Sequence, residues 1–196
     1  MRADARKNYD RLLAVAREVV TEHGADASLR DVARKADVGL GTLYRHFPTR
    51  EALIEALLRT DVDELTAQAA DLELSGTPED ALLTWFRGSV AITHEYRGLS
   101  GLLVAALEDT ESALNLSCVA LHDAGTRLLY RAQGAGVARA DIDGTDLFAL
   151  VAAAAWVYDQ PSLAPRADHL FSVISSAVLP NEASHVVTQE RPGPPR

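Results

Sequence analysis

Apolar residues recur every three or four positions along most of this chain, which is the spacing of one face of an α-helix. The first such stretch predicts a helix over about residues 3–23, ended by Gly24. Its apolar face consists of Tyr9, Leu12, Leu13, Ala16, Val19 and Val20. No stretch shows the period of two that is typical of a half-buried strand, so the pattern predicts an all-α fold.

Residues 28–58 predict two short helices joined by a tight turn and followed directly by a longer helix. Ser28 and Asp31 have the spacing of a capping box, which begins the first short helix. Gly39 is expected to supply the positive φ of the turn, because glycine tolerates that conformation. The second short helix runs over about residues 40–46, so the whole segment has the layout of a helix-turn-helix.

The run VGLGTLYRHFPTREALIEALL, residues 38–58, resembles the signature of the tetracycline-repressor (TetR) family of transcriptional regulators. It combines a Gly-Thr pair, an aromatic-basic-His-Phe run, a proline and an amphipathic helix in fixed register. The resemblance implies an N-terminal three-helix DNA-binding domain with a helix-turn-helix. It also implies a larger helical ligand-binding and dimerisation domain, with about nine helices in all.

Matched position by position, the resemblance implies DNA-binding residues at the start of the first short helix, along the recognition helix and just after it. These are Ser28, Arg30, Leu40, Gly41, Thr42, Tyr44, His46 and Arg50, to which Arg45 is added because it points away from the inner side of the recognition helix. Gly39 stands where the family usually has a hydroxyl cap, and Leu40 stands where lysine is frequent. The operator sequence therefore cannot be taken from relatives.

The net charge of the chain is −9, but it is divided unevenly. Residues 1–50 hold ten Lys and Arg against seven Asp and Glu, a net of +3, whereas residues 51–196 hold nine against twenty-one, a net of −12. The basic end would meet phosphate and the acidic remainder would be repelled from it.

An architectural DNA-binding protein would be basic throughout, so the charge pattern disfavours that alternative. A helical ligand-binding protein with a vestigial head is a further alternative, which the intact Thr42, Tyr44 and His46 disfavour.

The 196 residues are expected to divide into a DNA-binding domain (1–48), an effector-binding and dimerisation domain (49–179) and a disordered Pro-rich tail (180–196). Within the second part, Pro78 opens one helix, and residues 102–136 are expected to hold a short helix and a long one. No long apolar run and no signal-peptide layout is present, which predicts a cytoplasmic protein without a membrane partner. The single cysteine, Cys118, fits a reducing compartment.

An effector pocket is expected between helices of the second domain, where large aromatic residues alternate with a few polar ones. Each aromatic alone is more common in a plain core, so the prediction concerns the pocket more than any single residue. The candidate ligand-binding residues are Trp85, Phe86, His94, Asn115, Cys118, His122, Phe148 and Trp156.

Cys118 and His122 are spaced four residues apart and would share one helix face, as a metal or redox sensor requires. Two ligands do not make a metal site, and a third would have to come from elsewhere. A metal- or ligand-responsive helical sensor with a different output is therefore the alternative function, and no metal or other cofactor is expected.

A homodimer is expected to form through the two final helices, about residues 145–158 and 167–179, because both are apolar over more than one side. The candidate interface residues are Leu147, Val151, Ala153, Ala154, Leu170, Ile174, Ala177 and Val178.

No dinucleotide loop, P-loop, nucleophile elbow or zinc-protease motif is present, so the chain is not expected to be an enzyme. The function expected is a transcriptional repressor that binds palindromic double-stranded operator DNA as a dimer and is released by a small-molecule effector.

Overall fold

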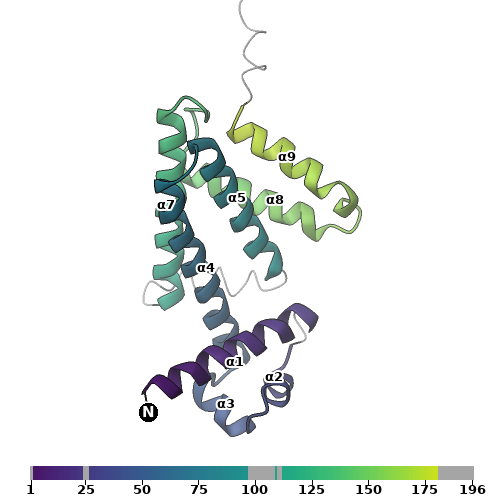
Figure 1. Cartoon of the computed structure of the whole chain (residues 1–196). Helices are drawn as coiled ribbons and strands as arrows, with labels where there is room; N and C mark the ends of the chain where they lie inside the picture. The colour runs from purple at the N-terminus through teal and green to yellow at the C-terminus, as the bar shows by residue number, and fades with distance from the viewer. Residues whose placement is uncertain (1, 24–26, 97–108, 110–111, 181–196) are drawn as a thin grey trace, which may run out of the picture.

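The computed structural model describes residues 2–23, 27–96, 109 and 112–180 (Figure 1). The described residues form eight α-helices, one 3-10 turn and no strand, which confirms the all-α prediction for this part of the chain. The short helix expected after residue 102 and nearly all of the expected disordered tail lie outside the described residues. The helices are α1 (Arg2–His23), α2 (Leu29–Lys35), α3 (Leu40–His46), α4 (Arg50–Leu74), α5 (Pro78–Glu95), α7 (Ala113–Gly134), α8 (Gly144–Asp159) and α9 (Ala167–Val178), with η2 (Ala164–Arg166) before the last.

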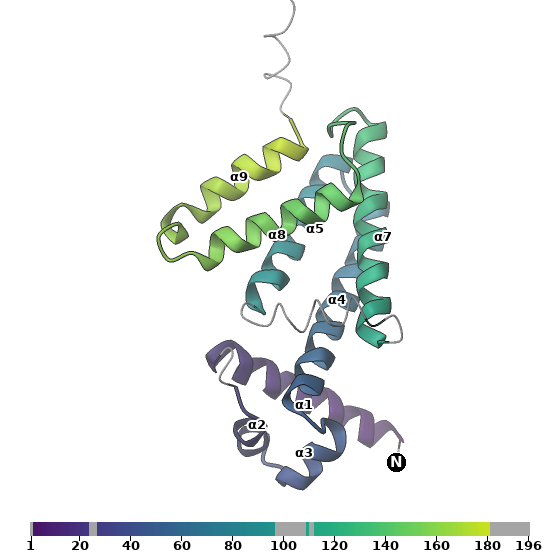
Figure 2. The same cartoon turned by 180° about the vertical axis from the view of Figure 1, so that it is seen from behind.

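The described helices form a small head and a larger body (Figures 1 and 2). Helices α1, α2 and α3 surround the first part of α4 and make the head, which carries the N-terminus. Helix α4 continues into the body, where it lies against α7 and α5. Helix α8 packs on α5, and α9 lies beside α8, away from α7. One continuous helix therefore joins the two parts.

Two hydrophobic clusters lie mainly in the head and in the body, and α4 contributes to both; the cluster of the head also includes Tyr96 after α5 and Leu114 of α7. Its first part buries Leu53, Ile54, Leu57 and Leu58 with side chains of α1, α2 and α3. Farther along, Val62, Leu65 and Ala69 of α4 belong to the cluster of the body. The expected domain boundary at residue 48 falls just before α4, yet the start of α4 belongs to the core of the head.

The helices begin where short polar side chains can accept hydrogen bonds from first-turn amides. Ser28 caps α2, Thr49 caps α4, Thr77 caps α5 ahead of Pro78, and Asp143 begins α8 with a complete capping box. Gly39, in contrast, gives α3 no side-chain cap. Helix α3 thus begins without the side-chain cap that α2 and α4 have.

The turn between α2 and α3 differs from the expectation in one respect. Asp37, with φ 51°, adopts the left-handed conformation, whereas Gly39 has an ordinary φ of −63°. The amide of Val38 donates to the carbonyl of Ala33 at 3.0 Å and that of Asp37 to Arg34 at 3.3 Å, which is the Schellman pattern of a helix end. Asp tolerates this conformation better than most residues, so no glycine is needed.

Close packing in the body depends on Gly125 of α7. A Cβ atom at this position would collide with the Trp85 ring of α5, which is fully buried. The absence of a side chain lets α7 approach the flat indole, and the rigid ring has no room to move away.

We expect Gly125→Ala to lower the free energy of unfolding by about 1–3 kcal/mol, because the added methyl group overpacks a rigid contact. Gly134→Ala, at the end of the same helix, is the control, since a Cβ there meets nothing within 4 Å. It should be neutral or stabilising by up to about 1 kcal/mol. Urea denaturation of both variants measures the difference, and equal stabilities would contradict the packing argument.

Candidate DNA-binding surface and ligand cavity

The recognition helix α3 is attached to the head by its inner side. Leu43 and the following Phe47 are buried in the cluster of the head, as the helical periodicity predicts. Tyr44, Gly41 and Arg45 are exposed on the opposite side, and the Tyr44 ring is 47% exposed. A short helix with an anchored inner face and an exposed polar and aromatic outer face fits the major groove of DNA.

A shallow groove on the head brings several of the candidate DNA-binding residues together. Residues at the start of α2, on α3 and at the start of α4 line it, and its volume is about 650 Å³. Five of the candidates, Ser28, Arg30, Leu40, Tyr44 and Arg50, are in this lining. Leu40 is half-buried and also packs against the core of the head, so only part of its side chain remains accessible.

The remaining candidates differ in their surroundings. The Arg45 guanidinium donates to Thr42 Oγ1 at 3.1 Å, and this leaves the Thr42 hydroxyl its own proton to donate. The His46 ring lies 5.9 Å from that of Tyr9, and it lines a separate depression with Arg59. Arg50 Nε donates to the carbonyl of Ala27 at 2.9 Å, which holds this arginine beside the start of α2.

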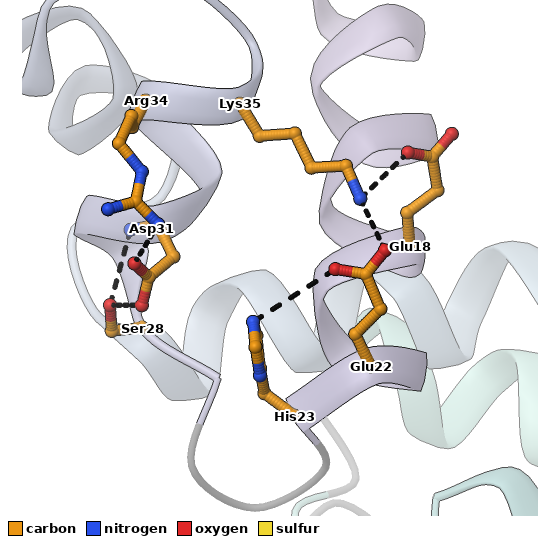
Figure 3. Close-up of polar contacts among 7 residues, drawn as sticks. All are labelled: Glu18, Glu22, His23, Ser28, Asp31, Arg34 and Lys35. Atoms are coloured by element: carbon orange, nitrogen blue, oxygen red, sulfur yellow. Dashed lines mark hydrogen bonds and ion pairs between the residues drawn. The ribbon is translucent and has the colours of Figure 1, made fainter.

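The first short helix is fixed by its own polar contacts (Figure 3). Ser28 Oγ accepts from the Asp31 amide at 3.2 Å and donates to Asp31 Oδ2, which lowers the pKa of Asp31; Arg34, 2.9 Å away, lowers it further. The Ser28 hydroxyl proton is therefore committed to the cap, so this residue positions α2 and is not available to donate to a phosphate.

Lys35 connects α2 to α1 in the same region (Figure 3). Its ammonium group lies 2.6 Å from Glu22 and 3.1 Å from Glu18, and these carboxylates raise the pKa of Lys35 through hydrogen bonds. The hydrogen bond from Lys35 in turn lowers the pKa of Glu22. Because its charge is matched by two acids, Lys35 serves the geometry of the head more than its positive potential.

A cavity of about 360 Å³ lies in the body between four helices. Its lining is mostly aliphatic and aromatic, with a few hydroxyl groups, one thiol and one imidazole. The lining residues are Leu58 and Val62 of α4, Ser89, Ile92 and Thr93 of α5, Cys118, Leu121 and His122 of α7, and Thr145, Phe148, Val151 and Ala152 of α8. A pocket of this size and character can hold a small organic molecule.

Three of the eight candidate ligand-binding residues line this cavity: Cys118, His122 and Phe148. The rings of His122 and Phe148 stack with centroids 4.9 Å apart. Fully buried Trp85 is not in the lining, because it packs edge-on behind Phe148 at a centroid distance of 5.4 Å. Trp85 thus supports the cavity wall from behind.

The other four candidates also lie away from the cavity. Phe86 is buried against Phe171, and Asn115 is buried in the first turn of α7. His94 Nδ1 lies 2.7 Å from Asp159 and borders a smaller cavity of about 160 Å³. Trp156 is 58% exposed on the outside of α8. Aromatic content alone therefore did not distinguish cavity wall from core and surface.

Sequence reasoning missed Ser89 and Thr93, which face the cavity one turn apart on α5. Two hydroxyl residues at positions i and i+4 of an otherwise apolar helix face would have been the available signal. The missed aliphatic lining residues, such as Leu121 and Val151, carry no such signal because they resemble any core residue.

Cys118 and His122 do share the cavity, as their spacing predicted. Within the described residues, however, no group of three or more His, Cys, Asp or Glu could hold a metal ion. Burial raises the pKa of the Cys118 thiol, and the charge of Asp63 raises it further, so the neutral thiol is favoured. These observations give the metal-sensor alternative no support from the described part of the chain.

A polar triad centred on a buried carboxylate connects head and body. Asp61 of α4 is only 5% exposed, and it forms an ion pair with Arg17 of α1. Tyr96, the C-cap of α5, donates its hydroxyl to Asp61 Oδ2 at 2.6 Å. Burial raises the pKa of Tyr96, and the hydrogen bond to Asp61 raises it further. One carboxylate therefore holds three helices in register.

The eight candidate dimer residues separate into two groups. Leu147, Val151, Ala154 and Val178 are buried in the core of the same chain and cannot reach a partner, which corrects their assignment to an interface. Their apolar character is explained by packing within the body. Leu170 and Ile174 are half-buried, and Ala153 and Ala177 are exposed.

The exposed apolar surface of the last two helices includes two larger side chains. Trp156 of α8 lies one turn from Ala153, and Val173 of α9, 51% exposed, lies one turn from Ala177.

No helix among the described residues is long and apolar enough to cross a membrane.

Comparison with known proteins shows the class of protein to which the chain is similar. Residues 12–57 match the model of bacterial regulatory proteins of the tetR family, and residues 77–177 match that of the C-terminal domain of SbtR-like transcriptional regulators. The HTH-type transcriptional regulator UidR of Escherichia coli (strain K12) is 29% identical over 110 residues, which are 56% of this chain and 55% of that protein. The chain thus matches only about half the length of this curated relative.

Solved structures resemble the chain over more of its length. A TetR transcriptional regulator from Streptomyces coelicolor has a TM-score of 0.68 and 36% identity, covering 88% of this chain and 98% of that one. A TetR regulatory protein from Mycobacterium vanbaalenii has a TM-score of 0.61 and 30% identity, covering 91% and 98%.

A helix-turn-helix head on a helical body defines a DNA-binding transcriptional regulator. The chain belongs to the TetR family. The family models describe transcriptional regulators.

We expect Tyr96→Phe to lower the free energy of unfolding by about 1.5–3 kcal/mol, because it deletes a buried hydrogen bond to a charged group. Tyr158→Phe is the matched control, since its hydroxyl bonds Asp168 at 3.0 Å on the surface, and it should change stability by less than about 0.5 kcal/mol. Urea denaturation at neutral pH checks both.

The raised pKa of Tyr96 also predicts a pH dependence. Below about pH 10 the tyrosine is protonated in both states, and the stabilisation is fully present. At higher pH the unfolded chain releases this proton before the folded one does, so stability falls. The fall above about pH 10 should be shallower in Tyr96→Phe than in the unchanged protein. If stability falls equally steeply with pH in both proteins, Tyr96 is not the group responsible for the fall.

Proposed function

We propose that this protein is a repressor that binds a palindromic operator as a homodimer and leaves it when a small molecule occupies the cavity of the body. The observation that carries this proposal is the position of Leu58 on α4. Its side chain belongs to the core of the head and also lines the cavity. A molecule in the cavity therefore contacts a residue on which the head is packed.

DNA recognition is assigned to the exposed side of α3 and to the groove beside it. Arg30, Tyr44, His46 and Arg50 would contact phosphates, and Thr42 would donate its hydroxyl proton to a base edge. Tyr44 and Arg30 line the same groove, so both can follow one DNA strand. The net charge of +3 in residues 1–50 favours this end over the acidic body.

Release from the operator would follow from a difference in the ligand's affinity for two conformations of the protein. A ligand shifts the balance between two conformations only if it binds one of them more tightly. The ligand must therefore favour an arrangement of α4 in which the two heads of a dimer no longer match successive major grooves, which are about 34–36 Å apart. Leu58 and Val62 are the α4 residues through which contact in the cavity would act.

The dimer is assigned to the outer faces of α8 and α9. Trp156 and Val173 are large apolar side chains exposed on these adjacent helices. Ala153 and Ala177 lie one turn from them and let a second backbone approach closely. A two-fold arrangement of this helix pair would form a four-helix bundle.

The proposal is tested by selecting duplexes from a random DNA library with the full-length protein. An enriched palindromic motif, followed by footprinting of the same motif in promoter DNA with and without small molecules, is the expected result. A selection that returns no motif would refute sequence-specific repression.

We expect Tyr44→Ala to weaken binding to the selected duplex by about tenfold, the value of one charge-assisted hydrogen bond to phosphate. The loss should be similar on all sequences, because phosphates carry no sequence information. Tyr130→Ala removes an equally exposed tyrosine from α7 of the body and should leave affinity unchanged. Fluorescence anisotropy at fixed salt measures both, and equal losses would contradict the assignment.

We expect Val173→Asp to convert the dimer to a monomer of 21.1 kDa at micromolar concentration, because an interface cannot bury an unpaired charge. Leu74→Asp places the same charge at the exposed end of α4 and should leave the dimer intact. Analytical ultracentrifugation distinguishes the species. An unchanged protein that sediments as a monomer would exclude this interface.

A further inference from the structure

Ser89 is an unusual residue on the cavity wall. It is 3% exposed, and its Oγ atom has no hydrogen-bond partner in the described part of the chain. Its neighbour Thr93 differs, because Thr93 Oγ1 donates to the carbonyl of Ser89 at 2.9 Å. A buried hydroxyl without a partner reduces stability, so its presence in a cavity wall points to a ligand that completes the bond.

The charges around the cavity restrict what the ligand can be. Among the described lining residues there is no Asp, Glu, Lys or Arg. Cys118 is a neutral thiol with a raised pKa, to which the negative charge of Asp63 contributes. The His122 imidazole has a carboxylate of its own nearby, Asp123, at 3.7 Å. An anionic ligand would lose its hydration in this cavity and find no Lys or Arg among the described lining residues to match its charge.

The size of the cavity and its aromatic wall further restrict the chemistry of the ligand. The volume of about 360 Å³ is near the lower end of the range for small-molecule pockets. Phe148 presents its ring to the cavity beside the stacked ring of His122, and Trp85 keeps Phe148 in place from behind. Such a wall favours a compact molecule with a flat apolar part.

We propose that the cavity binds an uncharged, compact and mainly apolar molecule that carries one hydroxyl-type group, and that Ser89 is the residue that recognises this group. This inference rests on the proposed function for the identity of the site, and it adds the chemical class of the effector. The ring of the molecule packs on Phe148, and its hydroxyl group exchanges a hydrogen bond with Ser89 Oγ.

The test uses four probes on one skeleton with the full-length protein in equilibrium dialysis at pH 7. The probes are 2-naphthol, naphthalene, the anion 2-naphthoate and the cation of 2-naphthylmethylamine. We expect 2-naphthol to bind roughly 2- to 10-fold more tightly than naphthalene, which is the value of one hydrogen bond. Both charged probes should bind at least about tenfold more weakly than 2-naphthol.

Two variants identify the residue responsible. Ser89→Ala should bind naphthalene as before and lose the preference for 2-naphthol. Without any probe it should melt at an equal or higher temperature, because it removes a buried hydroxyl without a partner. Thr60→Val, on α4 outside the cavity lining, removes a hydroxyl whose proton is already bonded to the carbonyl of Ala56, and it should keep the preference. Circular dichroism verifies that both variants are folded.

Several outcomes would overturn the proposal. These are tighter binding of 2-naphthoate or of the amine cation, no binding of any probe, or an undiminished 2-naphthol preference in Ser89→Ala. Because dialysis contains no DNA, these outcomes are independent of the operator selection. A protein that selects an operator but binds no probe refutes the ligand class alone, and one that binds 2-naphthol but selects no operator refutes the repressor function alone.

Discussion

Helix α4 is the element on which the rest of the structure depends, because the cores of the head and of the body both use it. Where it passes from one core to the other, Asp61 is buried between Arg17 of α1 and the Tyr96 hydroxyl at the end of α5. A buried carboxylate that loses one partner is left with an uncompensated charge, which is costly. The triad therefore favours one register of head against body and opposes intermediate ones.

Under the proposed function, this constraint would link the cavity in the body to the surface of the head. Leu58 and Val62 lie on α4 on either side of Asp61 in sequence, and both line the cavity. Packed interiors do not deform gradually, so a ligand at this wall would act by shifting α4 as a unit. Helix α3 would follow, because its Leu43 and the following Phe47 are packed in the same core as the start of α4.

The two parts of the molecule use polar groups in opposite ways. In the head, Lys35 pairs with acids of α1, and Ser28 and Asp31 cap α2, so surface charges fix the geometry while the outer side of α3 stays exposed. In the body, the cavity lacks charged side chains among its described lining, and Ser89 provides an unpaired hydroxyl instead. Under the proposed function, the first arrangement would leave the outer side of α3 free to meet DNA, and the second would suit an uncharged ligand.

The sequence by itself determined the local structure. Helical periodicity, the Ser28 cap of α2 and the proline that opens α5 follow from interactions within a few residues, so they were readable in advance. Only the tertiary structure decided which apolar residues became core, cavity or surface. Leu147 and Trp156 share one helix, yet the first is buried and the second is exposed. Trp85 lies behind Phe148 because Gly125, forty residues away, leaves room for its ring. Periodicity specifies a helix face, but which helices meet at that face is set by long-range packing.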